Sequence, residues 1–194
     1  MIELLPTPRI LQVDPACNPK KWISIQEAIS YYATDSILFE MGNPVMTYRA
    51  GLNKLTQKIT TFTTSSIIAV KGDSYRYSNR YPALTNDKLF ERDQYLCAYC
   101  GKVFAHKHLS RDHVTPICQK GKDVWANVVT SCKRCNGKKS GRTPEQAKMK
   151  LIYLPYMPDR YENFILDQGV KRILADQMEF LISNVSEHSR LKIS

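Results

Sequence analysis

Two pairs of cysteines with the same internal spacing constrain this chain more than any other feature. Two residues separate Cys97 from Cys100, and two separate Cys132 from Cys135. A two-residue gap lets both sulfurs of one tight turn reach a single ion, and two such turns complete a tetrahedron. We therefore predict that the four thiols bind Zn²⁺; the alternative is four independent buried cysteines. Four ligands leave no open coordination position, so this zinc is expected to be structural.

The positive charge of the chain is concentrated around these cysteines. The net charge is +10, and residues 71–142 hold 15 basic and 6 acidic residues, so most of the excess lies there. Four thiolates on one zinc ion would lower the local balance to about +7, which is still basic. Clustered positive charge suits a phosphate backbone, although many basic proteins bind no nucleic acid. The charge therefore indicates a nucleic-acid partner only in combination with other features.

A group of polar residues lies between the cysteine pairs and directly after the second pair. Asp112 and His113 are adjacent, Asn127 follows in the same insert, and Asn136 comes directly after Cys135. This pattern resembles an HNH endonuclease of the ββα-metal type, in the form that carries two CxxC pairs. The resemblance is specific over about residues 88–151. More loosely, residues 1–87 resemble the N-terminal part of stand-alone bacterial and phage HNH proteins.

The resemblance implies a catalytic role for each of these four residues. His113 would be the general base that takes a proton from the attacking water, a task that suits a side chain titrating near neutral pH. Asp112 would point to the other side of the same strand and bind a catalytic cation, with Asn136 as a second ligand. Asn127 would hold or orient His113. Oxygen ligands favour a hard ion, Mg²⁺ or Mn²⁺.

Basic side chains beside the motif are expected to contact DNA phosphates. Lys138, Lys139 and Arg142 follow Asn136, whereas Arg76 and Arg80 alternate with tyrosines before the motif and could equally belong to a solvated edge strand or linker. Lys133 and Arg134 are weaker candidates. Cleavage products with 5′-phosphate and 3′-hydroxyl ends are implied by the resemblance.

Taken singly, each motif residue has an ordinary structural explanation. A histidine can be a satisfied core residue, an aspartate a surface acid, and an asparagine a turn former. At the level of function, the alternatives to a DNA endonuclease are a non-catalytic zinc module that binds nucleic acid, and an HNH nuclease acting on RNA or DNA junctions. His106 and His108 form an H-x-H pattern that we interpret as exposed loop histidines. Cys17 and Cys118 fall outside the paired pattern.

The expected fold class is α+β, with a ββα-metal core. We divide the chain into an N-terminal mixed α/β segment (1–87), the HNH core with its zinc site (88–151) and a C-terminal helical extension (152–194). Strands are expected at 10–13, 36–40 and 59–70, and helices at 24–32 and 84–93, from Thr143 onward, and within 159–185 with a break near Gly169.

The remaining expectations concern where the protein acts and what it binds. The N-terminus lacks the basic patch and apolar run of a signal peptide, and no apolar stretch approaches the length of a membrane span. We therefore expect a cytoplasmic, bacterial or phage-encoded protein that binds double-stranded DNA, without a membrane partner, as a monomer or homodimer.

Overall fold

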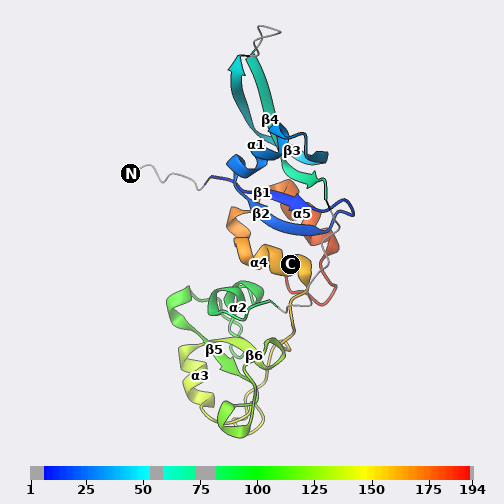
Figure 1. Ribbon diagram of the computed structural model, residues 1–194. Coiled ribbons are helices and arrows are strands. Elements are labelled where there is room, and N and C mark those ends of the chain that lie inside the picture. The colour runs from blue at the N-terminus through cyan, green and yellow to red at the C-terminus, as the bar shows by residue number, and fades with distance from the viewer. Residues whose placement is uncertain (1–6, 53–58, 73–81, 193–194) are drawn as a thin grey trace, which may run out of the picture. The chain divides into compact units, whose positions relative to one another are not determined.

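The computed structural model describes residues 7–52, 59–72 and 82–192. The chain divides into two compact units (Figure 1). The first contains Met1–Arg80 and Val170–Ser183, and the second contains Tyr81–Gly169 and Asn184–Ser194. The division of the sequence into three functional segments stays a prediction. None of the helices in the described part of the chain has the length and apolar character that a membrane crossing requires.

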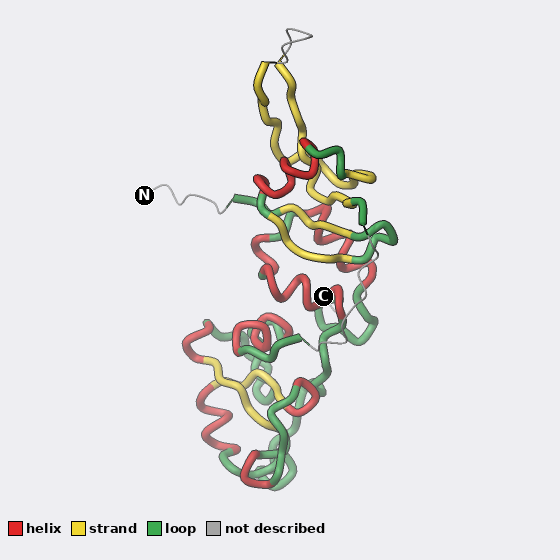
Figure 2. Tube along the Cα trace, in the orientation of Figure 1, coloured by secondary structure: helices red, strands yellow, loops and turns green. Residues whose placement is uncertain are grey.

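The first unit is built on a four-stranded sheet in the order β2-β1-β4-β3. Its strands are β1 (Ile10–Val13), β2 (Pro19–Ile23), β3 (Ile37–Leu52) and β4 (Ile59–Val70). β1 pairs parallel with β4, and the other two pairings are antiparallel. β3 and β4 continue beyond the other strands as a two-stranded ribbon (Figure 2).

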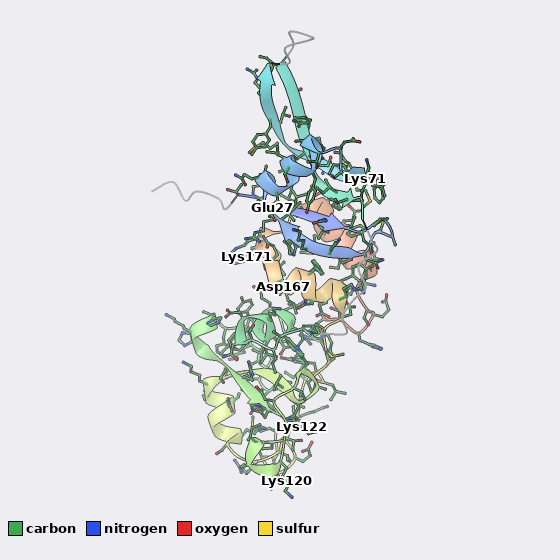
Figure 3. All side chains as sticks on the ribbon, in the orientation of Figure 1. Glu27, Lys71, Lys120, Lys122, Asp167 and Lys171 are labelled. Atoms are coloured by element: carbon green, nitrogen blue, oxygen red, sulfur yellow. The ribbon has the colours of Figure 1, made fainter. Side chains whose placement is uncertain are left out.

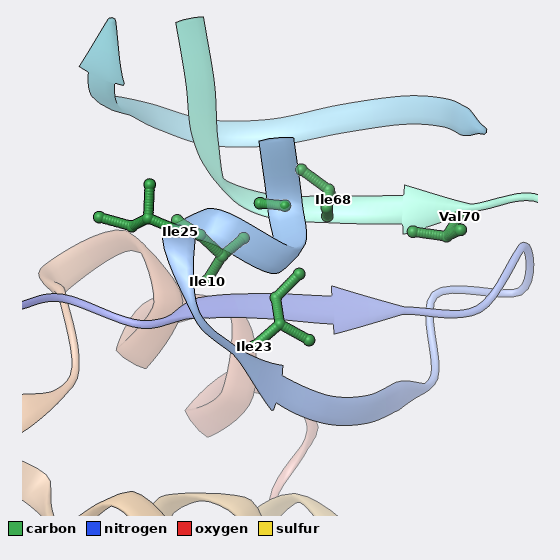
Figure 4. Close-up of a cluster of buried hydrophobic side chains, with 6 residues drawn as sticks. Ile10, Ile23, Ile25, Ile68 and Val70 are labelled. Atoms are coloured by element: carbon green, nitrogen blue, oxygen red, sulfur yellow. The ribbon is translucent and has the colours of Figure 1, made fainter. Parts of the chain in front are cut away.

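The helix α1 (Ile25–Ala33) begins where the sequence predicts it. The Ser24 side chain accepts from the Glu27 backbone N–H, and the Glu27 carboxylate accepts from the Ser24 backbone N–H, which completes a capping box. A cluster of buried apolar side chains (Figure 4) packs this helix onto the sheet: Ile10, Ile23, Ile25, Ala28, Ile68 and Val70. Because these residues come from four elements, burying them fixes the helix against the strands.

The C-terminal helix α5 (Ala175–Asn184) contributes most of its length to the first unit. Buried Gln177 donates through Nε2 to the carbonyl oxygens of Arg9 and Ser66, each at 2.8 Å. Asp176 accepts from the Ser66 hydroxyl and from the Asn43 backbone N–H. These hydrogen bonds attach α5 to the sheet, and the bond to the Ser66 carbonyl satisfies a buried polar group.

The second unit contains the ββα arrangement that the sequence predicts. β5 (Leu109–His113) and β6 (Val128–Cys132) form an antiparallel pair, and α3 (Lys133–Lys139) follows β6 directly. α2 (Asn86–Arg92) precedes the first cysteine pair, and α4 (Arg160–Gln168) follows the motif. Their core contains Leu89, Phe90, Leu109, Trp125 and Val128.

Most of the expected elements are present, but one expected helix is absent and one strand was not predicted. The predicted strands and the helices near 24–32 and 84–93 occur, and Gly169, at φ +81°, ends α4 where the break is expected. β2 is an additional strand. The helix expected from Thr143 is wrong: Thr143 and Gln146 exchange the capping hydrogen bonds, but only a turn forms. Lys148, at φ +53°, takes the left-handed conformation, which interrupts helical propagation.

Candidate metal centre and active site

The four paired cysteines come together in the second unit. The Sγ atoms of Cys97, Cys100, Cys132 and Cys135 all lie within 4.8 Å of one another. A tetrahedral zinc ion with bonds of about 2.3 Å requires sulfur–sulfur separations of about 3.8 Å, so this donor set fits zinc with small adjustments. Among the described residues, no other group of three or more potential ligands is close enough to hold an ion.

Local backbone geometry places the two cysteine pairs. The first pair occupies a turn in which the Gly101 N–H donates to the Cys97 carbonyl at 3.0 Å, with Gly101 at φ +66°. The second pair begins α3: Cys132 is the N-cap residue, and its Sγ accepts from the Cys135 N–H at 3.4 Å. The Ala98 N–H donates to the Thr130 carbonyl at 2.8 Å, which joins the first turn to β6.

The thiols of this cluster differ in their readiness to ionise. Burial opposes ionisation of Cys97, but hydrogen bonds from the backbone N–H groups of Cys132, Cys100 and Tyr99 outweigh it and lower the pKa to about 7. Burial and neighbouring thiols raise the pKa of Cys135 far above the ordinary thiol value. Mutual repulsion therefore opposes four thiolates at this place, and a metal ion would supply the compensating positive charge.

The alternation of side chains along β5 separates two groups of residues. Asp112 is buried, with 4% of its surface exposed, whereas the His113 side chain on the opposite face is 23% exposed. Ser110 shares the Asp112 face and accepts from Asn136 Nδ2 of α3 at 2.9 Å. Arg111 shares the His113 face. The expectation that Asp112 and His113 point to opposite sides of a strand agrees with these contacts.

Both oxygens of Asp112 are engaged by neighbouring side chains. Oδ1 accepts from Lys139 Nζ at 2.9 Å, and Oδ2 accepts from the Tyr99 hydroxyl at 2.5 Å. Lys139 is only 1% exposed and also donates to the His113 carbonyl at 2.7 Å. The contacts of Asp112 are therefore those of a buried ion pair that fastens α3 and the first cysteine turn to β5.

The His113 imidazole does not lie in apolar packing. Its Nε2 lies 2.9 Å from Asp123 Oδ1, in the loop that precedes β6. Arg111 NH1 reaches both oxygens of the same carboxylate, at 2.9 and 2.7 Å. Although burial opposes it, hydrogen bonds from His113 and Arg111 hold the pKa of Asp123 below its ordinary value. His113 thus sits beside an ionised carboxylate with part of its ring open to solvent.

The two asparagines of the motif occupy different places. Asn127 hydrogen-bonds to the backbone of the loop after His113: its Oδ1 accepts from the Thr115 N–H at 2.9 Å, and its Nδ2 donates to the Thr115 and Lys122 carbonyls. It thus shapes this loop and makes no direct bond to the imidazole. Asn136 uses Nδ2 to hold Ser110 and the Arg111 carbonyl, and its Oδ1 accepts no hydrogen bond from a described residue.

The basic residues expected to contact DNA divide into three groups. Lys138, in the last turn of α3, and Arg142, three residues after the helix ends, are exposed. Lys139 is buried and ion-paired, so we no longer propose it as a phosphate contact. Arg76 and Arg80 lie outside the described residues. Lys133 and Arg134, the weaker candidates, are exposed.

Sequence reasoning missed Asp123, which contacts His113, and the other polar residues of the loop that carries it. Lys120 and Lys122 are exposed in the loop that carries Asp123 (Figure 3). Gln119 Nε2 donates to the Gly141 carbonyl at 2.8 Å, which joins this loop to the turn after α3. A Gly-Lys-Asp sequence in a loop carries no signal of its own, because only the folded loop brings Asp123 to the histidine. His106 and His108 are exposed, as expected, and Cys17 and Cys118 lie outside the cysteine cluster.

Comparison with known proteins identifies a family that part of the chain matches. No curated protein matches the chain. The family model of the HNH endonucleases matches residues 97–152, which span both cysteine pairs, β5, β6 and α3. The matched segment contains Asp112, His113, Asn127 and Asn136. Residues 97–152 of this chain are therefore a domain of the HNH endonuclease family.

Proposed function

We propose that this protein is a metal-dependent endonuclease that hydrolyses phosphodiester bonds of double-stranded DNA, by nicking or by cutting both strands. The observation that carries the proposal is the position of His113. Its imidazole is part-exposed beside an ionised carboxylate, on the strand of a ββα unit that lies within the HNH endonuclease match. A pure binding module has no use for a solvent-accessible base held in this way.

In the proposed reaction, His113 accepts a proton from a water molecule as the water oxygen attacks phosphorus. The bond between phosphorus and the 3′-oxygen breaks, and solvent protonates the leaving oxygen, which gives 5′-phosphate and 3′-hydroxyl ends. Asp123 stabilises the imidazolium that forms, because its carboxylate lies 2.9 Å from Nε2. A positioned general base of this kind contributes about 10²- to 10⁴-fold to the rate.

Exposed cations around the His113 loop would position the DNA backbone. Lys120 and Lys122 lie on the loop itself, and Lys138 and Arg142 lie at the turn that Gln119 joins to it. Side chains of this type bind phosphates and fix the register of a duplex without reading its sequence. Binding should therefore weaken steeply with added salt.

The Cys97, Cys100, Cys132 and Cys135 cluster would hold one structural zinc ion. The donor set consists of four thiols from two turns that are each fixed by backbone hydrogen bonds. Zinc would bind the folded unit and stabilise it without touching the substrate, because four sulfur ligands fill its coordination sphere.

The proposed catalytic cation, Mg²⁺ or Mn²⁺, would need a binding site of its own, distinct from the four cysteines. When bound, such an ion supplies stabilisation of negative charge on the scissile phosphate. Asp112 and Asn136 are oxygen ligands of the right chemistry, and the Oδ1 of Asn136 accepts no hydrogen bond from a described residue. As its contacts stand, however, Asp112 does not fit a divalent ion, because the Lys139 ammonium and the Tyr99 hydroxyl hold its two oxygens. A cation at Asp112 requires Lys139 to move.

A cleavage assay on a panel of substrates tests the proposed function. The zinc-loaded protein is incubated with supercoiled plasmid, single-stranded DNA, a DNA junction and structured RNA, each with Mg²⁺, Mn²⁺ or EDTA. We expect nicked or linear plasmid with a divalent ion and none with EDTA. Preferential cleavage of the junction or the RNA would show that this molecule, and not duplex DNA, is the substrate. Salt-sensitive binding with no cleavage of any substrate would identify a non-catalytic nucleic-acid-binding module instead.

A further inference from the structure

We propose that Asp123 is a positioning residue that holds His113 with the hydrogen on Nε2 and leaves Nδ1 free to accept a proton from the attacking water. This inference rests on the proposed function, in which His113 is the base. Neither the motif pattern nor the expected roles of Asp112, Asn127 and Asn136 include Asp123, which comes from a loop between β5 and β6.

The contact with Asp123 determines which ring nitrogen of His113 carries the hydrogen. His113 Nε2 and Asp123 Oδ1 are 2.9 Å apart. An ionised carboxylate can only accept, so the ring nitrogen that faces it must carry the hydrogen. A neutral imidazole carries one hydrogen, so Nδ1 is then the unprotonated atom and the only ring position that can act as a base.

A second contact fixes the carboxylate itself. Arg111 NH1 lies 2.9 and 2.7 Å from the two oxygens of Asp123. Arg111 is held in turn, because its Nε donates to Asn86 Oδ1 at 3.0 Å and its NH2 donates to the Leu84 carbonyl at 3.3 Å. Asp123 is therefore anchored to the segment around the start of α2 as well as to β5.

The strand explains why these side chains meet. Arg111 and His113 are two residues apart on β5, so they project from the same face. The Asp123 carboxylate contacts both Arg111 and His113, and its side chain is 52% exposed. The three side chains therefore lie at the surface, where a phosphate can approach. The Asn127 side chain bonds to the backbone of Thr115 and Lys122 and so shapes the loop that delivers Asp123.

The second unit contains another His–Asp pair, in which no described arginine holds the carboxylate. His106 Nε2 lies 2.7 Å from Asp87 Oδ1, and both side chains are well exposed. Among the described residues, no arginine contacts Asp87, in contrast to the Arg111 contact of Asp123. The pair of Asp87 and His106 is therefore an internal control for the general effect of losing a surface carboxylate beside a histidine.

The test compares Asp123→Ala and Asp123→Asn with Asp87→Ala in the full-length, zinc-loaded protein. ¹⁵N NMR of the imidazole nitrogens, recorded where the ring is neutral, reports which nitrogen carries the hydrogen. We expect one Nε2–H form for His113 in the wild type and in Asp87→Ala, and a mixture in Asp123→Ala. The asparagine variant should retain more of the Nε2–H form, because its amide oxygen can still accept.

Kinetics supply the second measurement. We expect Asp123→Ala to lower kcat about 10- to 100-fold, a part of what a general base contributes, without raising KM. Asp123→Asn should recover part of that loss, and Asp87→Ala should leave kcat unchanged. A general structural role would instead lower stability and activity together in both Asp123 variants, and would not change the tautomer.

Two results would overturn the inference: a wild-type His113 that carries its hydrogen on Nδ1, or an unchanged kcat in Asp123→Ala when His113→Ala abolishes cleavage. Failure of the proposed function is distinguishable from both. A wild-type protein that cuts no substrate would remove the role of His113 as a base, while the NMR comparison would still decide whether Asp123 sets its tautomer.

Discussion

The Tyr99 hydroxyl donates to Asp112 Oδ2 at 2.5 Å, although Tyr99 belongs to the metal-binding turn and Asp112 to the strand that carries the proposed base. Tyr99 lies between Cys97 and Cys100, and Asp112 directly precedes His113. One side-chain hydrogen bond thus links the cysteine turn to β5. Burial and this carboxylate raise the pKa of Tyr99, so the phenol remains a donor.

Replacement of this donor should destabilise the second unit. Tyr99→Phe removes a partner of the buried Asp112 carboxylate, and we expect a loss of about 1–3 kcal/mol in the free energy of unfolding. Chemical denaturation monitored by circular dichroism measures it. Tyr161→Phe on α4 is the matched control, because the Tyr161 hydroxyl makes no hydrogen bond to a described residue. Equal stability losses in the two variants would contradict the assigned role of Tyr99.

Removal of the Lys139 ammonium, which pairs with Asp112, should lower the free energy of unfolding more than Tyr99→Phe does. Lys139→Met leaves a buried carboxylate without its charge partner, which costs about 3–5 kcal/mol. Adding Asp112→Asn to the same chain should recover part of the loss, because the unpaired charge disappears. A double-mutant cycle on denaturation midpoints measures the coupling. If the stability loss of the double variant equals the sum of the losses of the two single variants, Lys139 and Asp112 do not act as a pair.

Loss of the proposed zinc should unfold the second unit. In Cys132→Ser the ion loses one sulfur ligand, and the turn and the start of α3 lose their common anchor. Because metal binding and folding are coupled in small sites, we expect a large fall in thermal midpoint together with loss of bound zinc. Cys118→Ser, outside the cluster, is the control. A Cys132→Ser variant with the wild-type midpoint and zinc content would refute the structural role.

Buried Glu162 on α4 should make stability depend on pH. Burial raises its pKa above the ordinary value, although hydrogen bonds from Tyr156 and Ser189 lower it, so the unfolded chain ionises this group more readily than the folded one. Its ionisation therefore costs stability as pH rises from the ordinary glutamate value through the raised one. Glu162→Gln should be more stable than the wild type at pH 7, with the advantage fading near pH 4. Thermal melts at pH 7 and pH 4 measure this. The same difference in thermal midpoint between Glu162→Gln and the wild type at both pH values would contradict the prediction.

The parts of the site that are close in sequence could be predicted. The spacing of each cysteine pair fixes a turn, and the adjacency of Asp112 and His113 on a strand fixes their opposite faces. The capping box at Ser24 is likewise a local pattern, and it appears as expected. In each case the information lies within four residues, where backbone geometry alone decides the outcome.

The parts that depend on tertiary contacts could not be predicted. Lys139 lies in a basic run that is typical of a solvated surface, yet it is buried because Asp112, 27 residues earlier, offers a carboxylate on the facing strand. β2 contains a proline and two lysines, and it becomes a strand only by pairing with β1. Asp123 reaches His113 through the fold of a loop.

The most direct test of the central claim is plasmid cleavage by His113→Ala, with His188→Ala as the control and zinc content measured on each preparation. His188 is exposed outside the motif, so its removal should change nothing. We predict that His113→Ala loses about 10²- to 10⁴-fold in cleavage rate while it keeps its zinc and its thermal midpoint. Undiminished cleavage by zinc-loaded, folded His113→Ala would contradict the assignment of His113 as the base.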